Sequence, residues 1–207
     1  MVAYDLTTKR KKPSRVFYTE RGFNESSTVI RFAMTVGLCD DVKQLSNIAS
    51  SVTNSDGVFF IPTFVSMAGF VGFKNSTTKE HLVRAVLESI VFQVASFFFL
   101  TKEEVSYHFD KIKIDGGISE NDFICQQIAD LINVKIERSV NSSELTSYGV
   151  AYLSSYISGA VLDELEHASK FYKVDKIFIP NEANRKELFM RYKKFETILK
   201  TFERFKL

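Results

Sequence analysis

Hydrophobic residues recur along this chain at two periods, which predict alternating strands and helices. Ile112 and Ile114 alternate with lysines, the pattern of a half-buried strand. Runs rich in Val, Phe and Ile predict two strands before residue 24 and others at 57–62, 134–137 and 176–180. Apolar residues at helical spacing predict helices over about 26–37, 40–52, 81–100, 119–131, 142–156 and 181–202. This order of elements predicts an α/β domain with helices on both faces of a mixed sheet.

The run at residues 81–100 is long and apolar enough to suggest a membrane span. Arg84, Glu88 and Gln93 interrupt it, so a buried core helix accounts for it better than a membrane helix. Because the run is apolar on most sides, we expect this helix at the centre of the domain. Arg84 and Glu88 are four residues apart, which predicts a helix-stabilising ion pair worth about 0.3 kcal/mol.

Two capping-box patterns predict where helices begin. Thr77 and Glu80 precede the long apolar helix, and Ser119 and Asp122 precede the helix that follows the strand at 111–114. A glycine inside a helix costs about 1 kcal/mol relative to alanine. Gly149 lies inside the predicted helix at 142–156, so we expect close packing there, with contact to a ligand as the alternative.

An Asp-Gly-Gly turn joins the strand at 111–114 to the next helix. Gly116 and Gly117 have no Cβ, so the backbone can adopt positive φ or lie against a flat ligand. Such a junction presents free backbone N–H groups and the positive end of a helix dipole. Many turns of this kind bind nothing, so the spacing alone leaves both readings open.

Composition restricts the class of protein. A chain of 207 residues is long enough for a single domain over 1–207, and its net charge of +2 gives no argument for binding nucleic acid or a membrane. The basic cluster at 9–12 precedes a proline and is typical of a solvated hairpin tip. Cys39 and Cys125 have no metal-ligand spacing and no secretory leader is evident, so we expect reduced thiols, a cytoplasmic location and no metal site.

Six segments keep the residues and the order of one known family. They lie at 57–62, 81–93, 115–123, 129–131, 136–138 and 146–153, and the third reads Asp-Gly-Gly-Ile-Ser-Glu-Asn-Asp-Phe. Together they resemble glycerol kinase and, more broadly, the C-terminal domain of the FGGY carbohydrate kinase family. The resemblance runs from about residue 15 to the C-terminus. It implies a ribonuclease-H-like, actin-like ATPase domain.

The resemblance also implies a nucleotide site. In the family this domain supplies the adenine side of a cleft that binds ATP or ADP with Mg²⁺, and the matching positions here are Gly116, Gly117 and Asn121. Gly117 would let a purine stack on bare backbone, and the Asn121 amide can donate to and accept from adenine edge atoms. We expect no catalytic residue in this chain, because the family's general base lies in the N-terminal domain.

Two departures from the family leave alternatives open. The N-terminal domain that orients the acceptor has no counterpart here, so this chain alone is expected to be inactive and to need that domain as its partner. Ser66 stands about where a family glycine approaches the nucleotide phosphates, and its Cβ could obstruct them. The parent protein is therefore either a glycerol or polyol kinase or a non-catalytic regulatory protein derived from one.

The last predicted helix carries an apolar stripe that is expected to pack on the body of the domain. It consists of Leu188, Tyr192, Phe195, Leu199 and Phe202. The same stripe could instead serve a partner helix. Together with the uncovered interface to the N-terminal domain, it predicts possible homo-oligomers.

Overall fold

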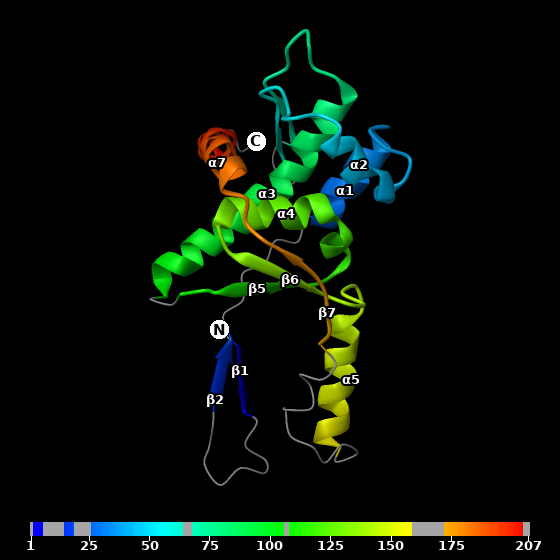
Figure 1. Cartoon of the computed structure of the whole chain (residues 1–207), viewed down its shortest axis with the longest axis vertical. Coiled ribbons are helices and arrows are strands. Elements are labelled where there is room, and N and C mark those ends of the chain that lie inside the picture. The colour runs from blue at the N-terminus through cyan, green and yellow to red at the C-terminus, as the bar shows by residue number, and fades with distance from the viewer. Residues whose placement is uncertain are drawn as a thin grey trace.

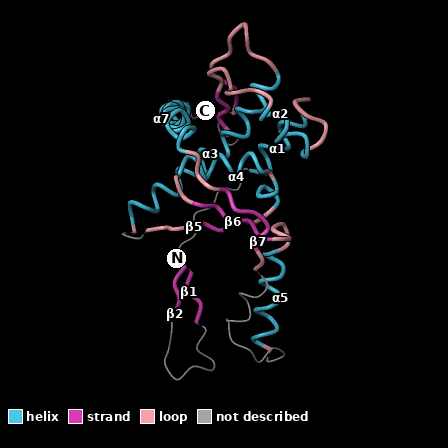
Figure 2. The backbone as a smooth tube through the Cα atoms, viewed as in Figure 1, coloured by secondary structure: helices cyan, strands magenta, loops and turns pink. Residues whose placement is uncertain are grey.

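The computed structural model describes residues 2–5, 15–18, 26–63, 68–105, 108–158 and 172–204. The elements run in the order β1 (Val2–Asp5), β2 (Arg15–Tyr18), α1 (Ser26–Thr35), the 3-10 helix η2 (Val42–Gln44), α2 (Leu45–Ser50), β3 (Phe59–Ile61), β4 (Gly69–Val71), α3 (Lys79–Glu104), β5 (Lys111–Ile114), the 3-10 helix η3 (Gly117–Glu120), α4 (Asp122–Ile132), β6 (Lys135–Ser139), α5 (Leu145–Ile157), β7 (Val174–Phe178) and α7 (Glu182–Glu203). Figures 1 and 2 show their arrangement.

The central sheet is mixed, as the sequence predicts. It has the order β5-β6-β7, with β5 parallel to β6 and β6 antiparallel to β7. Ile136 pairs with Ile112 on one side and with Phe178 on the other, and both Ile136 and Phe178 are buried. Helix α4 packs against β6 and β7, while α5 extends away from the sheet on the opposite side in Figure 1. The hairpins β1-β2 and β3-β4 form separate two-stranded sheets.

Helix α3 lies at the centre of the described fold, packed against α2, α4 and β3. It is long and apolar enough to cross a membrane by length and composition, but 61% of its most apolar window is buried inside the protein. Such burial is typical of the core helix of a globular domain. The sequence prediction of a central buried helix is therefore confirmed.

The capping residue of helix α3 (Lys79–Glu104) lies one position later than the predicted capping box at Thr77. The backbone N–H of Thr78 donates to Nδ1 of His81 at 3.0 Å, so Thr78 is the capping residue. The hydroxyl of Thr77 instead accepts from the backbone N–H of Lys74 at 2.9 Å, which closes the preceding turn. Adjacent threonines offer the same cap chemistry, and the turn decides between them.

The apolar stripe of α7 packs on the body, as predicted. Leu188, Tyr192 and Phe195 are all at most 4% exposed. The rings of Tyr192 and Phe195 lie 6.1 and 5.2 Å from the ring of Phe92 in α3. These contacts give two of the chain's phenylalanines, Phe92 and Phe195, a structural role, since they join α7 to the central helix.

Arg84 and Glu88 form the i, i+4 ion pair that the sequence predicts, and Glu88 has a further partner. Glu88 is 1% exposed, and its Oε1 accepts from Nε of Arg84 at 2.9 Å. Its other oxygen accepts from Nη2 of Arg191, which comes from α7. Nη1 of Arg84 also donates to the backbone carbonyls of Ala49 and Val52. The predicted ion pair is therefore present, and it belongs to a network that joins α2, α3 and α7 rather than to one helix alone.

Candidate functional site

A cavity of about 590 Å³ lies where α1, η2, η3 and the first turn of α4 meet. It is lined by Ser26, Ser27, Ile30, Val42, Lys43, Ser46, Gly117, Ile118, Glu120, Asn121 and Ile124. Two of the residues predicted from sequence, Gly117 and Asn121, thus lie on one wall. We call this the first cavity.

Gly116 forms the turn that carries this wall. Its φ of 81° and ψ of 168° suit glycine alone, and its N–H donates to the carbonyl of Ser142 at 2.9 Å. Gly116 is not among the residues that line the first cavity. A Cβ added to Gly117 would meet no atom of the described residues within 4 Å, so this part of the fold gives no packing reason for glycine there.

The start of α4 differs from the predicted capping box. Ser119 lies buried inside η3, where its hydroxyl donates to the carbonyl of Gly116 at 2.7 Å. Asn121 caps α4, and its Oδ1 accepts from the backbone N–H of Ile124 at 3.1 Å. Its Nδ2 has no hydrogen-bond partner among the described residues. Asn121 therefore offers a ligand chiefly a donor, which narrows the double role predicted from its side chain.

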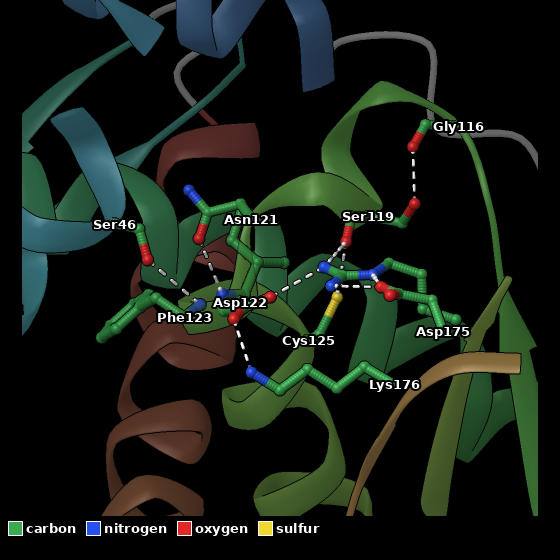
Figure 3. A network of polar contacts seen from close by, with 11 residues as sticks. Ser46, Gly116, Ser119, Asn121, Asp122, Phe123, Cys125, Asp175 and Lys176 are labelled. Carbon is green, nitrogen blue, oxygen red and sulfur yellow. Dashed lines mark hydrogen bonds and ion pairs between the residues drawn. The ribbon is translucent and has the colours of Figure 1, made fainter. Parts of the chain in front are cut away.

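A charged network behind the first cavity fixes η3 and the start of α4 (Figure 3). Nη1 of Arg138, from β6, donates to the Ser119 carbonyl at 2.9 Å and to Oδ1 of Asp122 at 2.7 Å. Its Nη2 donates to Oδ2 of Asp175 at 2.7 Å. Lys176 donates to Oδ2 of Asp122 at 2.6 Å. Strands β6 and β7 thus hold the segment that presents Gly117 and Asn121.

Two groups in this network titrate away from their ordinary range. Burial acts to raise the pKa of Asp122, but hydrogen bonds from Lys176 and Arg138 outweigh it and lower that pKa overall. Burial raises the pKa of the Cys125 thiol to about 12. That thiol donates to the Ser119 carbonyl at 3.1 Å, so it serves as a packing group beneath η3.

The lining of the first cavity suits a flat ring with an attached anionic group. Ile30, Ile118 and Ile124 supply apolar surface to a cavity that Gly117 leaves free of a side chain. Helices α1 and α4 both begin at the cavity, and the positive end of each helix dipole favours negative charge. Lys43 adds a cation to the lining and Glu120 a carboxylate, so the helix starts supply the rest of the positive potential. These residues fit an adenine nucleotide.

Sequence reasoning missed most of this lining. Ser26, Ile30 and Lys43 come from α1 and η2, more than seventy residues before Gly117 in the chain, and no local motif marks them. The approach of these helices to η3 is a tertiary contact, which no local pattern encodes. The N-cap preference of asparagine was the one signal that pointed to the observed start of α4.

No described residue packs closely on Gly149, so the prediction of close packing is wrong for the described part of the chain. A Cβ added there would meet no atom of the described residues within 4 Å. Gly149 instead lines a mostly apolar cavity of about 540 Å³ together with Asp115, Tyr148 and Tyr172. The Asp-Gly-Gly turn thus borders two cavities, with Asp115 on this one and Gly117 on the first.

The remaining predictions concern Ser66, the basic cluster at 9–12, metal binding and the two cysteines. Ser66 and the basic cluster at 9–12 both fall outside the described residues. Within the described residues, no group of three or more His, Cys, Asp or Glu side chains gathers as a metal site. Cys39 and Cys125 are both buried and free.

Comparison with known proteins finds one family. The model of the C-terminal domain of the FGGY family of carbohydrate kinases matches residues 28–157. Glycerol kinase 5 of Gallus gallus is 34% identical over 177 residues, which cover 82% of this chain and 34% of that protein. Glycerol kinase 2 of Thermotoga maritima is 33% identical over 187 residues, covering 82% of this chain and 37% of that protein. The chain thus spans about a third of the length of these relatives.

Solved structures show the same fold. A crystal structure of Plasmodium falciparum glycerol kinase with ADP superimposes with a TM-score of 0.71 at 26% identity, over 84% of this chain and 37% of that one. A ligand-bound xylulose kinase from Lactobacillus acidophilus gives a TM-score of 0.66 at 21% identity, over 84% and 38%. The predicted α/β fold with a mixed sheet is confirmed by these matches.

Proposed function

This chain belongs to the FGGY family of carbohydrate kinases, whose C-terminal domain it matches, and we propose that it is the nucleotide-binding part of an ATP-dependent kinase of glycerol or a related polyol. The observation that carries the proposal is the placement of Gly117 and Asn121 on one wall of the first cavity. The similarity to glycerol kinases, one of them solved with ADP, supports the choice of nucleotide and of acceptor class.

In this proposal adenine lies against the backbone of Gly117, between the apolar side chains of Ile30, Ile118 and Ile124. Nδ2 of Asn121 donates to a ring nitrogen of adenine, because Oδ1 is already committed to the Ile124 N–H. The phosphates lie toward the helix starts and Lys43, where positive potential is available. Arg138 and Asp122 keep this wall in place without touching the ligand.

The chemical step belongs to the parent protein. There the acceptor hydroxyl of glycerol attacks the γ-phosphate of Mg-ATP and gives glycerol 3-phosphate and ADP. Phosphoryl transfer depends on orienting both substrates. The matched part of this chain covers only 34% and 37% of these relatives, so we propose that the rest of their length corresponds to the part that binds the acceptor. We expect no turnover by residues 1–207 alone, and we place the protein in the cytoplasm, in keeping with its two free thiols.

The proposal is tested by titrating Mg-ADP into the isotopically labelled chain and following the backbone amides by NMR. We expect saturable shifts centred on Gly117, Ile118 and Asn121 in the low-millimolar range. Asn121→Asp is the matched control, because it keeps the capping oxygen and removes the amide donor. Shifts that are absent, or equal in the two proteins, would count against the site.

A second function keeps the same site but not the chemistry. A regulatory protein derived from a kinase would bind nucleotide without transferring phosphate. Acceptor-dependent ATP turnover by the parent protein separates the two. Turnover with glycerol or another small polyol excludes the regulatory reading, and nucleotide binding without any turnover supports it. Self-association is a separate prediction, checked by sedimentation across a wide range of concentrations.

A further inference from the structure

A second cavity, of about 500 Å³, lies between α2, α3, α4 and α7, which gather in the upper part of Figure 1. Most of its lining is polar, and the residues that matter here are Arg84, Glu88, Gln127 and Arg191. It touches the first cavity only through Ser46, which lines both. Gly117 and Asn121 do not line it.

Two guanidinium groups share one carboxylate at this second cavity. Arg84 and Arg191 each bind one oxygen of Glu88, and their side chains are 12% exposed against 1% for Glu88. One buried carboxylate and two largely buried guanidinium groups together carry one positive charge in excess. Two other carboxylates line the cavity, but Asp122 is already paired with Arg138 and Lys176, and Glu187 is exposed to solvent. The excess positive charge near the floor is thus left without a buried partner.

The guanidinium groups also retain unused donors. Both oxygens of Glu88 are occupied by the two bonds just described, yet Nη2 of Arg84 and Nη1 of Arg191 have no hydrogen-bond partner among the described residues. Nε of Arg191 is likewise buried without a partner in that part of the chain. A guanidinium presents its N–H groups in a planar fork that matches the oxygens of carboxylate and phosphate.

Gln127 independently indicates a ligand in the second cavity. It is 8% exposed and lines the second cavity, but its carboxamide makes no hydrogen bond to any described residue. Neither atom of this amide is among the fully buried unpaired atoms, so the polar end of the side chain is what remains open at the cavity. Its neighbour Gln126 shows the ordinary arrangement, since its Nε2 donates to Asp130 at 2.7 Å and to the Ile179 carbonyl at 2.9 Å. The Gln127 carboxamide is therefore available to form hydrogen bonds with a ligand inside the cavity.

We propose that the second cavity binds a small organic anion, through a carboxylate or phosphate group held by Arg84, Arg191 and Gln127. The excess charge attracts the anion and the unused N–H groups hold its oxygens. The side-chain oxygens of Gln126 and Asn184, which also line the cavity, accept hydrogen bonds from hydroxyl groups on the rest of the ligand. This site is distinct from the nucleotide site and does not depend on the proposed kinase function.

The test follows the chemical shifts of the Gln127 side-chain and backbone amides in the full chain during titration with inorganic phosphate, and separately with malonate, at constant ionic strength. We expect saturable shifts at millimolar concentration, at least tenfold weaker binding in Gln127→Met, and no change in Arg185→Gln. The last variant removes one positive charge from a residue that does not line this cavity. The tighter of the two anions identifies the carboxylate or the phosphate source.

Gln127→Glu gives an opposite readout from the same position. Here the protein supplies its own carboxylate to the excess positive charge, so we expect a higher melting temperature and no phosphate or malonate shifts. A buried carboxylate with no free cation nearby would instead lower the melting temperature. The proposal is overturned by destabilisation in Gln127→Glu, or by anion shifts in the wild type that do not saturate or that persist unchanged in Gln127→Met.

Discussion

The carboxamide oxygen of Asn121 accepts a hydrogen bond from the backbone N–H of Ile124 at 3.1 Å, and both residues line the first cavity. The residue that starts α4 is thus also a wall of the candidate nucleotide site. Its oxygen stabilises the helix, and its nitrogen remains available to a ligand. Variants at this position can therefore separate folding from binding.

Asn121→Ala should lower both stability and nucleotide affinity, whereas Asn121→Asp should lower affinity alone. Removing the cap costs about 1 kcal/mol of unfolding free energy, and aspartate caps as well as asparagine does. Urea denaturation measures the first effect and NMR titration with Mg-ADP the second. Equal stability of the alanine variant and the wild type would show that the cap contributes nothing.

Gly116→Ala should destabilise the chain, and Gly117→Ala should not. Gly116 has a φ of 81° and ψ of 168°, so a side chain there is strained by roughly 2 kcal/mol. A Cβ on Gly117 projects into open space. We expect that variant to keep its melting temperature and to bind Mg-ADP at least several-fold more weakly. Unchanged affinity in Gly117→Ala would place the nucleotide elsewhere.

Asp122 should contribute stability that disappears in acid. Its folded pKa lies below the unfolded value of about 4, because the bonds from Lys176 and Arg138 outweigh burial. The contribution is therefore complete above pH 4 and lost as the pH falls through the folded pKa. Asp122→Asn should cost about 0.5 kcal/mol at pH 7, the scale of a half-exposed ion pair. Denaturation between pH 7 and pH 2 should show the two proteins converging.

Glu88→Gln should be the most damaging of these changes. It leaves the guanidinium groups of Arg84 and Arg191 buried without a counter-charge, and breaking a buried ion pair in this way costs about 4 kcal/mol. Loss of cooperative thermal unfolding, or a melting temperature lower by ten degrees or more, is the expected result. A variant as stable as the wild type would mean that the network is well solvated.

Both cysteines should resist alkylation in the folded chain. Cys125 is fully buried and its pKa is raised to about 12, so little thiolate exists at pH 8. Burial also raises the pKa of Cys39. Labelling by iodoacetamide, followed by mass spectrometry, should track the unfolding transition in urea. Rapid labelling of Cys125 without denaturant would reveal local opening beneath η3.

Local patterns are sufficient for most of the elements. The alternation at 111–114 predicts β5, and the apolar run at 81–100 predicts α3 with its central position. The stripe on α7 is also predictable, and three of its residues are at most 4% exposed. These predictions succeed because each one depends on which face of a single element is apolar.

Features that need two distant segments could not be read from the sequence. Glu88 binds Arg191, which lies 103 positions later in the chain. The i, i+4 pattern with Arg84 therefore reveals neither the burial of Glu88 nor the excess positive charge of the three side chains. The first cavity depends on α1 and η2 closing over η3. The start of α4 is ambiguous for a different reason, because Ser119 and Asn121 are both good capping residues and an intervening 3-10 turn selects the second.

Ser46 is a lining residue that the two cavities share. Its hydroxyl accepts from the backbone N–H of Phe123 at 3.3 Å, in the first turn of α4 (Figure 3). A nucleotide in the first cavity and an anion in the second cavity would both contact the start of α4. Thermodynamic linkage then requires reciprocity: whatever factor the anion applies to nucleotide affinity, the nucleotide applies to anion affinity. A single residue would let each occupant report the presence of the other.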